Sequence, residues 1–139
     1  MLIKCPNCQK FNRLPLDRIN DKPVCGACKS SLTLGAIEAD QASFSEILKG
    51  SRLPVIVDFW APWCGPCKMF APTFQASATK LGDQILHIKI DTEANPAIGQ
   101  QYNIRSIPTL AIFKNGLEVE RISGALPPSQ LQQLISRFI

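Results

Sequence analysis

Two cysteines three residues apart, Cys64 and Cys67, lie between an apolar run and a helical pattern, and this junction strongly constrains the fold. The apolar run Val55–Trp60 precedes them and is typical of a buried strand. Residues i and i+3 share a face in the first turn of a helix, so two sulfur atoms there can join with little backbone movement. The unpaired amide groups at a helix start also favour a thiolate. We therefore predict a redox-active dithiol at a strand-to-helix junction.

Four further cysteines stand near the start of the chain, as the pairs Cys5/Cys8 and Cys25/Cys28 with sixteen residues between them. This spacing is typical of a zinc ribbon, in which four thiolates close a tetrahedral shell around a structural ion. Because residues 1–34 carry few large apolar side chains, we expect this segment to need the ion in order to fold. Two additional redox pairs, a disulfide set such as Cys5–Cys28, and iron in the same sulfur cage are the alternatives.

The formal net charge of +4 originates in the N-terminal segment. Residues 1–34 carry six Lys or Arg and two Asp, whereas residues 35–139 carry nine charged residues of each sign. A nucleic-acid surface is one interpretation of this excess. Charge compensation is the preferred one, since four thiolates and one Zn²⁺ leave a net negative charge. The basic residues that would offset it are Lys4, Lys10, Arg13, Lys22 and Lys29.

Length and composition favour one folded domain with a small appendage. The 139 residues are 45% hydrophobic and 19% charged, as in globular proteins. Met1–Lys4 leads directly into Cys5 without the apolar core of a signal peptide, and no apolar stretch approaches the roughly 20 residues of a membrane span. We expect a cytoplasmic protein without membrane contact. In that compartment six cysteines favour metal binding and redox chemistry over a disulfide framework.

Strand and helix patterns alternate through the rest of the chain, which predicts an α/β fold with one mixed sheet between helices. We expect a small zinc-ribbon module at residues 1–34 and a larger domain at residues 35–139, with the boundary near 31–36, where Leu32, Leu34 and Ile37 alternate weakly. Predicted strands cover 53–60, 85–90, 109–113 and 117–123, the last two joined by a turn at Asn115-Gly116. Predicted helices cover 44–49, 66–81 and 96–102, and a last helix begins at 127–129. Ser43 is expected to cap the first helix in a capping box with Glu46, and Asn95 to cap the third. Pro72 is expected to kink the second helix, which Gly82 stops.

Several separate motifs resemble those of the thioredoxin family. They are Val57-Asp58-Phe59-Trp60-Ala61, Trp63-Cys64-Gly65-Pro66-Cys67-Lys68, Ile107-Pro108-Thr109, Phe113-Lys114-Asn115-Gly116 and Gly124-Ala125. The resemblance runs from about residue 36 to the C-terminus, and with the four-cysteine module the whole chain resembles the zinc-containing bacterial thioredoxin 2 subfamily. It implies a thioredoxin fold with Pro108 in the cis form, and thioredoxin reductase as the electron donor. Pro62 departs from the acidic residue of familiar thioredoxins, so the redox potential is not carried over.

The resemblance also implies catalytic roles. Cys64 is expected to attack a substrate disulfide and Cys67 to resolve the mixed disulfide. Asp58 is a carboxylate within an apolar run, so it must be paired or have a raised pKa. By resemblance Asp58 is the buried acid that helps deprotonate Cys67, with Lys89 as its partner; an exposed strand edge is the alternative. Lys68 either lowers the thiol pKa through its charge or is a solvated helix residue.

A substrate-docking surface is implied beside the dithiol. A cis bond at Pro108 would expose the Ile107 backbone for strand-like pairing with an extended peptide. The lone histidine, His87, is expected to be a bystander, and Phe59 and Trp60 are expected to pack in the core. The expected substrate-binding residues are Trp63, Gly65, Pro66, Ile107, Pro108 and Gly124.

Three functions agree with these features. The first is a thiol-disulfide oxidoreductase that reduces protein disulfides. The second is a disulfide oxidase or isomerase of the same fold, and the third is a zinc-ribbon adaptor or redox sensor that carries such a domain. Gly65-Pro66 between the cysteines, as in the reductases of the family, favours the first. Protein disulfides are then the expected substrates, with structural Zn²⁺ as the cofactor and no nucleic-acid partner.

Overall fold

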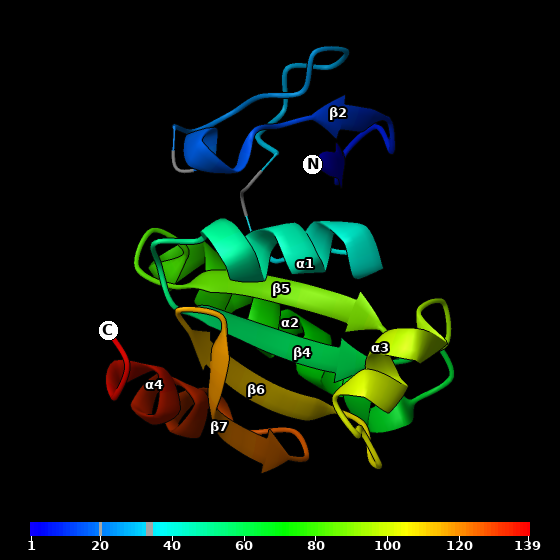
Figure 1. The fold of residues 1–139 in the computed structure, drawn as a ribbon, viewed down its shortest axis with the longest axis vertical. Helices are drawn as coiled ribbons and strands as arrows, with labels where there is room; N and C mark the ends of the chain where they lie inside the picture. Colours follow the sequence, from blue (N-terminus) through cyan, green and yellow to red (C-terminus); the bar gives the residue numbers. More distant parts are fainter. Residues whose placement is uncertain (20, 33–34) are drawn as a thin grey trace.

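A five-stranded mixed sheet forms the centre of the fold in the computed structural model, which describes residues 1–19, 21–32 and 35–139 (Figure 1). The strand order is β3-β5-β4-β6-β7. The parallel strands are β3 (Ile37–Glu38), β5 (Leu86–Asp91) and β4 (Val55–Trp60), and the antiparallel strands are β6 (Thr109–Lys114) and β7 (Leu117–Ser123). The predicted α/β architecture with one mixed sheet is confirmed.

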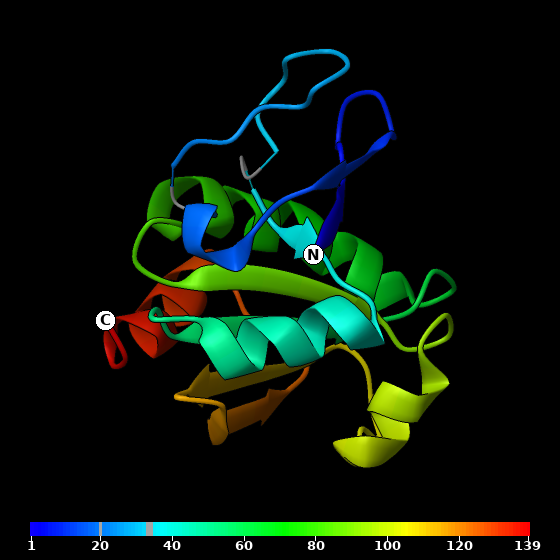
Figure 2. The same cartoon turned by 45° about the horizontal axis from the view of Figure 1, so that its top comes forward.

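Helices cover both faces of this sheet (Figures 1 and 2). Helices α1 (Gln41–Gly50) and α3 (Pro96–Gln101) lie on one face, and α2 (Gly65–Leu81) and α4 (Pro128–Ser136) lie on the other. Because side chains alternate along a strand, β4 contributes to two cores. Phe59 packs in the same core as Phe44 of α1, whereas Ile56 packs in the core that contains Phe74 of α2. This two-sided burial explains the continuous apolar run of β4.

Helix α1 begins three residues earlier than predicted, at Gln41, because Asp40 is its cap. The Ser43 backbone N–H donates to Asp40 Oδ1 at 2.9 Å, and the Asp40 N–H donates to Ser43 Oγ at 3.0 Å. Ser43 thus occupies the third helical position of a reciprocal capping box, and Glu46 has no part in it. The prediction that Ser43 caps the helix and pairs with Glu46 was wrong.

The predicted turn at Asn115-Gly116 is present, whereas the predicted helix cap at Asn95 is not. Asn115 and Gly116 have φ angles of 53° and 79°, the left-handed values that a tight hairpin turn requires, and this prediction is confirmed. Asn95 precedes α3, but its side chain makes no capping hydrogen bond and donates instead to the Asp91 carbonyl oxygen. Helix α2 continues through Pro72 and ends at Leu81, before Gly82.

The N-terminal module consists of a hairpin, β1 (Leu2–Lys4) and β2 (Phe11–Arg13), and a short 3₁₀ helix η1 (Leu16–Arg18) (Figure 2). Its buried side chains belong to the same hydrophobic core as α1 and β3. Leu16 of η1 packs directly on Gly50 of α1. A Cβ atom on residue 50 would lie only 2.5 Å from Leu16 Cδ2, so glycine leaves the room for this contact. The buried apolar residues of the module in this core are Ile3, Leu14, Ile19 and Leu32.

The proposed division between residues 34 and 35 remains a prediction. Thr33 and Leu34 lie outside the described residues, so the part of the expected alternation that includes Leu34 is outside them as well. Residue Ile37 of that pattern starts β3, which pairs with β5 in parallel through Ile37 and Ile88.

Candidate functional site

Cys64 and Cys67 lie where β4 gives way to α2, and their sulfur atoms are joined in a disulfide. Their Cα atoms are 5.2 Å apart. Cys64 is the cap of α2, and the Cys67 backbone N–H donates to Cys64 Sγ at 3.2 Å. Both residues are buried, Cys64 at 4% and Cys67 at 2% exposure, so Cys64 is the slightly more accessible of the two. The predicted pair at a strand-to-helix junction is confirmed as capable of forming a disulfide.

The backbone around Pro108 borders this disulfide. The Ile107–Pro108 peptide bond is cis, as the family resemblance implied, and the Ile107 carbonyl oxygen lies 3.8 Å from Cys64 Sγ. The Gly124 N–H donates to the Pro108 carbonyl oxygen at 2.8 Å, and its φ of +98° is one that favours glycine. Trp63 is 68% exposed, and Gly65 and Pro66 are exposed beside it. The geometry thus places Ile107 against the dithiol and leaves Trp63 open to a partner.

Asp58 is fully buried in the middle of β4, at 0% exposure. Among the described residues, neither of its carboxylate oxygens has a hydrogen-bond partner. Loss of solvent around the charged form therefore raises the pKa of Asp58 to about 7, and the positive charge of Lys89 offsets part of this rise. A carboxyl group with such a pKa exchanges a proton readily near neutral pH.

Lys89 stands opposite Asp58 in the parallel pairing of β4 and β5. Its amine lies 4.6 Å from the centre of the Trp60 ring, a cation–π arrangement, and among the described residues no ion pair joins it to Asp58. The indole Nε1 of Trp60 is buried, and no described residue forms a hydrogen bond with it. Lys89 therefore acts on Asp58 through its charge, while its direct contact is with Trp60.

His87 of β5 is buried against α2, at 2% exposure. Its Nδ1 lies 3.0 Å from the Ile85 carbonyl oxygen, which can only accept, so Nδ1 carries the proton. Its Nε2 then accepts from the Ser77 hydroxyl at 2.9 Å. Burial lowers the pKa of His87 to about 4. The expectation that His87 is a bystander did not include this contact with Ser77.

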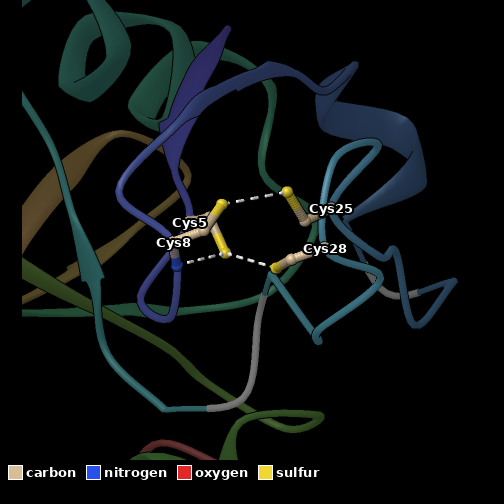
Figure 3. A group of neighbouring side chains, drawn as sticks. All are labelled: Cys5, Cys8, Cys25 and Cys28. Atoms are coloured by element: carbon tan, nitrogen blue, oxygen red, sulfur yellow. Dashed lines mark hydrogen bonds between the residues drawn. The ribbon is translucent and has the colours of Figure 1, made fainter.

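The remaining four cysteines converge in the N-terminal module (Figure 3). All four sulfur atoms lie within 4.8 Å of one another, and the pairs Cys5/Cys28 and Cys8/Cys25 are each separated by 3.6 Å. A tetrahedral zinc site with Zn–S bonds of about 2.3 Å requires sulfur atoms about 3.8 Å apart. The cluster therefore fits the ion that the spacing predicted.

Two backbone loops of the same shape hold these sulfurs. The Cys5 sulfur accepts from the N–H groups of Asn7 and Cys8, and the Cys25 sulfur accepts from the Ala27 N–H. The residue after the second cysteine in each loop has a left-handed φ, 69° at Gln9 and 67° at Lys29. Amide donors that point at sulfur favour the thiolate, the form that binds metal.

Two asparagine side chains, which the sequence analysis did not single out, complete the sulfur environment. Asn12 Nδ2 donates to Cys25 Sγ at 3.4 Å, and Asn7 Nδ2 donates to Cys28 Sγ at 3.6 Å. A backbone hydrogen bond from Cys28 and the Asn12 side chain lower the pKa of Cys25 to about 7. Hydrogen bonds from Ser30 and from Asn7 lower the pKa of Cys28 to about 5.

Among the helices in the described part of the chain, none is long and apolar enough to cross a membrane. The mixed sheet, the dithiol at the start of α2 and the cis proline beside it together define a thiol-disulfide oxidoreductase.

Comparison with known proteins identifies the family. The Thioredoxin family profile matches residues 35–137, and the profile described as Thioredoxin 2, N-terminal, matches residues 4–30. The chain is 45% identical over 138 residues to Thioredoxin C-3 of Corynebacterium nephridii, covering 99% of this chain and 94% of that protein. It is 46% identical over 102 residues to the thioredoxin of Porphyra purpurea, covering 73% of this chain and 95% of that one.

A solved structure agrees with these matches. The thioredoxin of Malassezia sympodialis superimposes with a TM-score of 0.67 at 36% identity, covering 75% of this chain and 91% of that one. The chain belongs to the thioredoxin family and carries the N-terminal module of thioredoxin 2. The predicted fold, a thioredoxin domain with a small four-cysteine module, is confirmed.

Proposed function

We propose that this thiol-disulfide oxidoreductase reduces protein disulfides, with Cys64 as the nucleophile and Cys67 as the resolving thiol. The observation that carries the proposal is the hydrogen bond from the Cys67 N–H to Cys64 Sγ, because an amide donor stabilises a thiolate on Cys64. In the reduced protein this thiolate attacks one sulfur of a substrate disulfide and releases the other as a thiolate. Cys67 then attacks Cys64 Sγ, which releases the second substrate sulfur and leaves the Cys64–Cys67 disulfide.

Asp58 is proposed as the group that accepts the proton of Cys67 before this second step. Its burial and its pKa of about 7 support the role, since a weaker acid than a surface Asp is a better proton acceptor. Lys89 is proposed to keep the carboxylate accessible at neutral pH by its positive charge. The docking role of Trp63, Gly65, Pro66, Ile107, Pro108 and Gly124 belongs to the same proposal, supported by the exposure of Trp63 and the contact of Ile107 with Cys64.

Cys5, Cys8, Cys25 and Cys28 are proposed to hold one structural Zn²⁺. The sulfur separations and the amide donors around them support this. Bound there, the ion would supply folding free energy rather than catalysis, because four protein ligands leave no open coordination position. Thioredoxin reductase as the electron donor, a part in electron transport and cell redox homeostasis, and a cytoplasmic location complete the proposal; the family membership supports them.

Single serine variants of the two cysteines test the proposal. With a dithiol reductant and a disulfide-bonded protein as substrate, Cys64→Ser is expected to abolish turnover. Cys67→Ser, reduced beforehand and freed of reductant, is expected to stop after one attack and to accumulate the mixed disulfide at Cys64, which mass spectrometry detects. Turnover by Cys64→Ser close to that of the wild type would contradict the proposal.

The redox potential separates a reductase from an oxidase or isomerase of the same fold. Equilibration of the Cys64/Cys67 couple with glutathione measures it, and a reductase is expected to lie closer to the roughly −270 mV of thioredoxin than to the potentials of the oxidising members of the fold. A value near the roughly −180 mV of protein disulfide isomerase would favour the second function instead.

A further inference from the structure

We infer that the outer face of the β1–β2 hairpin is a second substrate-docking surface, which binds an acidic segment with apolar side chains on the disulfide-bearing protein. The inference rests on the proposed reductase function and adds a specificity-determining surface to it. The residues of this face, the hairpin face below, are Leu2, Lys4, Phe11 and Arg13.

The pairing of the two strands places these four side chains together. In the antiparallel register Leu2 is opposite Arg13, and Lys4 is opposite Phe11. Residues i and i+2 of a strand share a face, so each strand contributes one apolar and one basic side chain. Asn12 lies on the other face of the hairpin, since its side chain reaches the Cys25 sulfur.

The hairpin face is exposed although two of its residues are large and apolar. Phe11 is 68% exposed and Leu2 is 57% exposed. Burial of a large apolar side chain is favourable, so a partner that covered Phe11 and Leu2 would gain free energy that the folded module alone does not use. Aromatic side chains and Arg, here Phe11 and Arg13, are enriched at protein interfaces.

Charge decides the kind of partner. Lys4 and Arg13 carry the only charges on the hairpin face, and the segment 1–34 around it keeps a net positive charge of about +2 after its formal +4 is reduced by the −2 of four thiolates and one Zn²⁺. An acidic partner would therefore be attracted to it. A single-stranded nucleic acid fits less well, because such ligands need successive aromatic rings to stack on, and this face has one.

The hairpin also lies towards the reactive end of the molecule. Figures 1 and 2 both show β1 and β2 on the side where β4 and β5 end, which is where α2 begins with Cys64. The turn between β6 and β7 lies at the opposite end in both views. A protein whose disulfide is held at Cys64 can thus extend towards the hairpin face.

That distant turn provides a matched control. Lys114 and Leu117 form a cross-strand pair of one basic and one apolar residue, like Lys4 and Phe11. Leu117 is 71% exposed, close to the value for Phe11. The variant K114E/L117S therefore makes the same change of charge as K4E/F11S and removes an apolar side chain of similar fractional exposure, far from the dithiol.

The experiment uses the full chain with zinc and two synthetic disulfide peptides. One peptide bears an extension rich in Glu and Leu, and the other has Gln in place of each Glu. At low salt, the KM for the acidic peptide is expected to be roughly fivefold lower, about 1 kcal/mol of binding. K4E/F11S is expected to remove this difference and K114E/L117S to keep it. Added salt is expected to raise the KM of the wild type for the acidic peptide only.

Equal KM values for the two peptides at low salt would overturn the inference, as would an equal loss in both double variants. Competition by a single-stranded oligonucleotide stronger than that by the free Glu-rich extension would assign the face to nucleic acid and overturn it too. Turnover of cystamine, a small disulfide, reports the dithiol alone; its absence in the wild type would refute the proposed function instead. If K4E/F11S loses zinc, the milder K4Q/R13Q replaces it, with the same peptides and the same expected loss.

Discussion

Asp58 and His87 are buried in the otherwise apolar layers around the sheet, and burial shifts the pKa of each. Asp58 has no hydrogen-bond donor among the described residues and only the charge of Lys89 to oppose its desolvation. His87 has a partner at each ring nitrogen, and Ser77 is one of them. Burial raises the pKa of the acid and lowers the pKa of the imidazole, so both groups favour their neutral forms.

Asp58→Asn is expected to stabilise the oxidised protein increasingly as pH rises. The pKa of Asp58 is about 7 in the folded protein against 3.8 for an unperturbed aspartate, so folding holds a proton that the unfolded chain releases. The wild type therefore loses stability relative to the variant between pH 4 and pH 7, on the order of 4 kcal/mol at most; His87 is present in both proteins, so its opposite pH dependence cancels. Urea unfolding at pH 4 and pH 8 measures this. The exposed Asp83→Asn serves as control, and a constant difference between Asp58→Asn and wild type would refute the prediction.

H87V/S77A is expected to make the protein more resistant to acid. The pKa of His87 falls from 6.5 to about 4 on folding, so its contribution to stability is lost as pH drops from 6.5 towards 4. Over that window the wild type should lose on the order of 3 kcal/mol relative to the double variant. Asp58 is present in both proteins, so its opposite pH dependence cancels. Parallel stability curves between pH 7 and pH 4 would show that His87 does not titrate as expected.

At the scale of elements, the ends of the helices differ in how their first amide groups are satisfied. Helix α1 uses the reciprocal Asp40 and Ser43 capping box, and α2 uses the sulfur of Cys64. Helices α3 and α4 make no side-chain capping bond and rely on proline in the first turn, Pro96 and Pro128. The sulfur atom of Cys64 therefore both caps α2 and forms the disulfide with Cys67.

Asp40→Ala is expected to lower the free energy of unfolding by about 1 kcal/mol, the usual cost of removing a helix cap. Asp40→Asn keeps an acceptor for the Ser43 N–H and should cost less. Hydrogen bonds from the Ser43 backbone and hydroxyl lower the pKa of Asp40 below 3.8, so its contribution is present at neutral pH and is lost in acid. Urea unfolding at pH 7 compares the three proteins; equal losses in the Ala and Asn variants would exclude the cap as the cause.

At the scale of the whole molecule, the four-cysteine module and the sheet share one hydrophobic core. Ile3 and Ile19 of the module pack in the same cluster as Ile37 and Phe44. Ile19 of the module and Leu86 of β5 belong to this core as well, and both line two pockets open to solvent, of about 500 and 550 Å³. Unfolding of the module would therefore expose apolar surface of the larger domain.

Removal of zinc is expected to lower the melting temperature of the entire chain, and not of the module alone, by roughly 10 °C or more. The physical reason is the shared core, since loss of the ion unfolds the residues that cover α1 and β3. Calorimetry with and without chelator measures the effect, zinc readdition should reverse it, and Cys25→Ser should reproduce it. A melting temperature of the sheet domain that does not change with chelator would contradict the shared core.

Local patterns predicted the parts of this protein whose cause is local. The apolar run of β4, the turn at Asn115 and Gly116 and the pairs Cys5/Cys8 and Cys25/Cys28 are each recognisable within a short stretch of the chain. The start of α1 was misplaced because Asp40 and Ser43 both have capping side chains, and only the reciprocal bond distinguishes them. The expected cap at Asn95 failed because its amide found another acceptor.

The sequence by itself therefore determined the dithiol, the group of four cysteines, the strand and helix order of residues 35–139 and the family, because these depend on residue type and spacing along the chain, whereas β1, β2 and η1 were not predicted. Only the tertiary structure decided which side chains that are distant in sequence are in contact. It buried His87 against Ser77, put Lys89 on Trp60 instead of on Asp58, and packed Leu16 of the module onto Gly50. Such contacts depend on how layers distant in sequence pack together, and no local pattern encodes that packing.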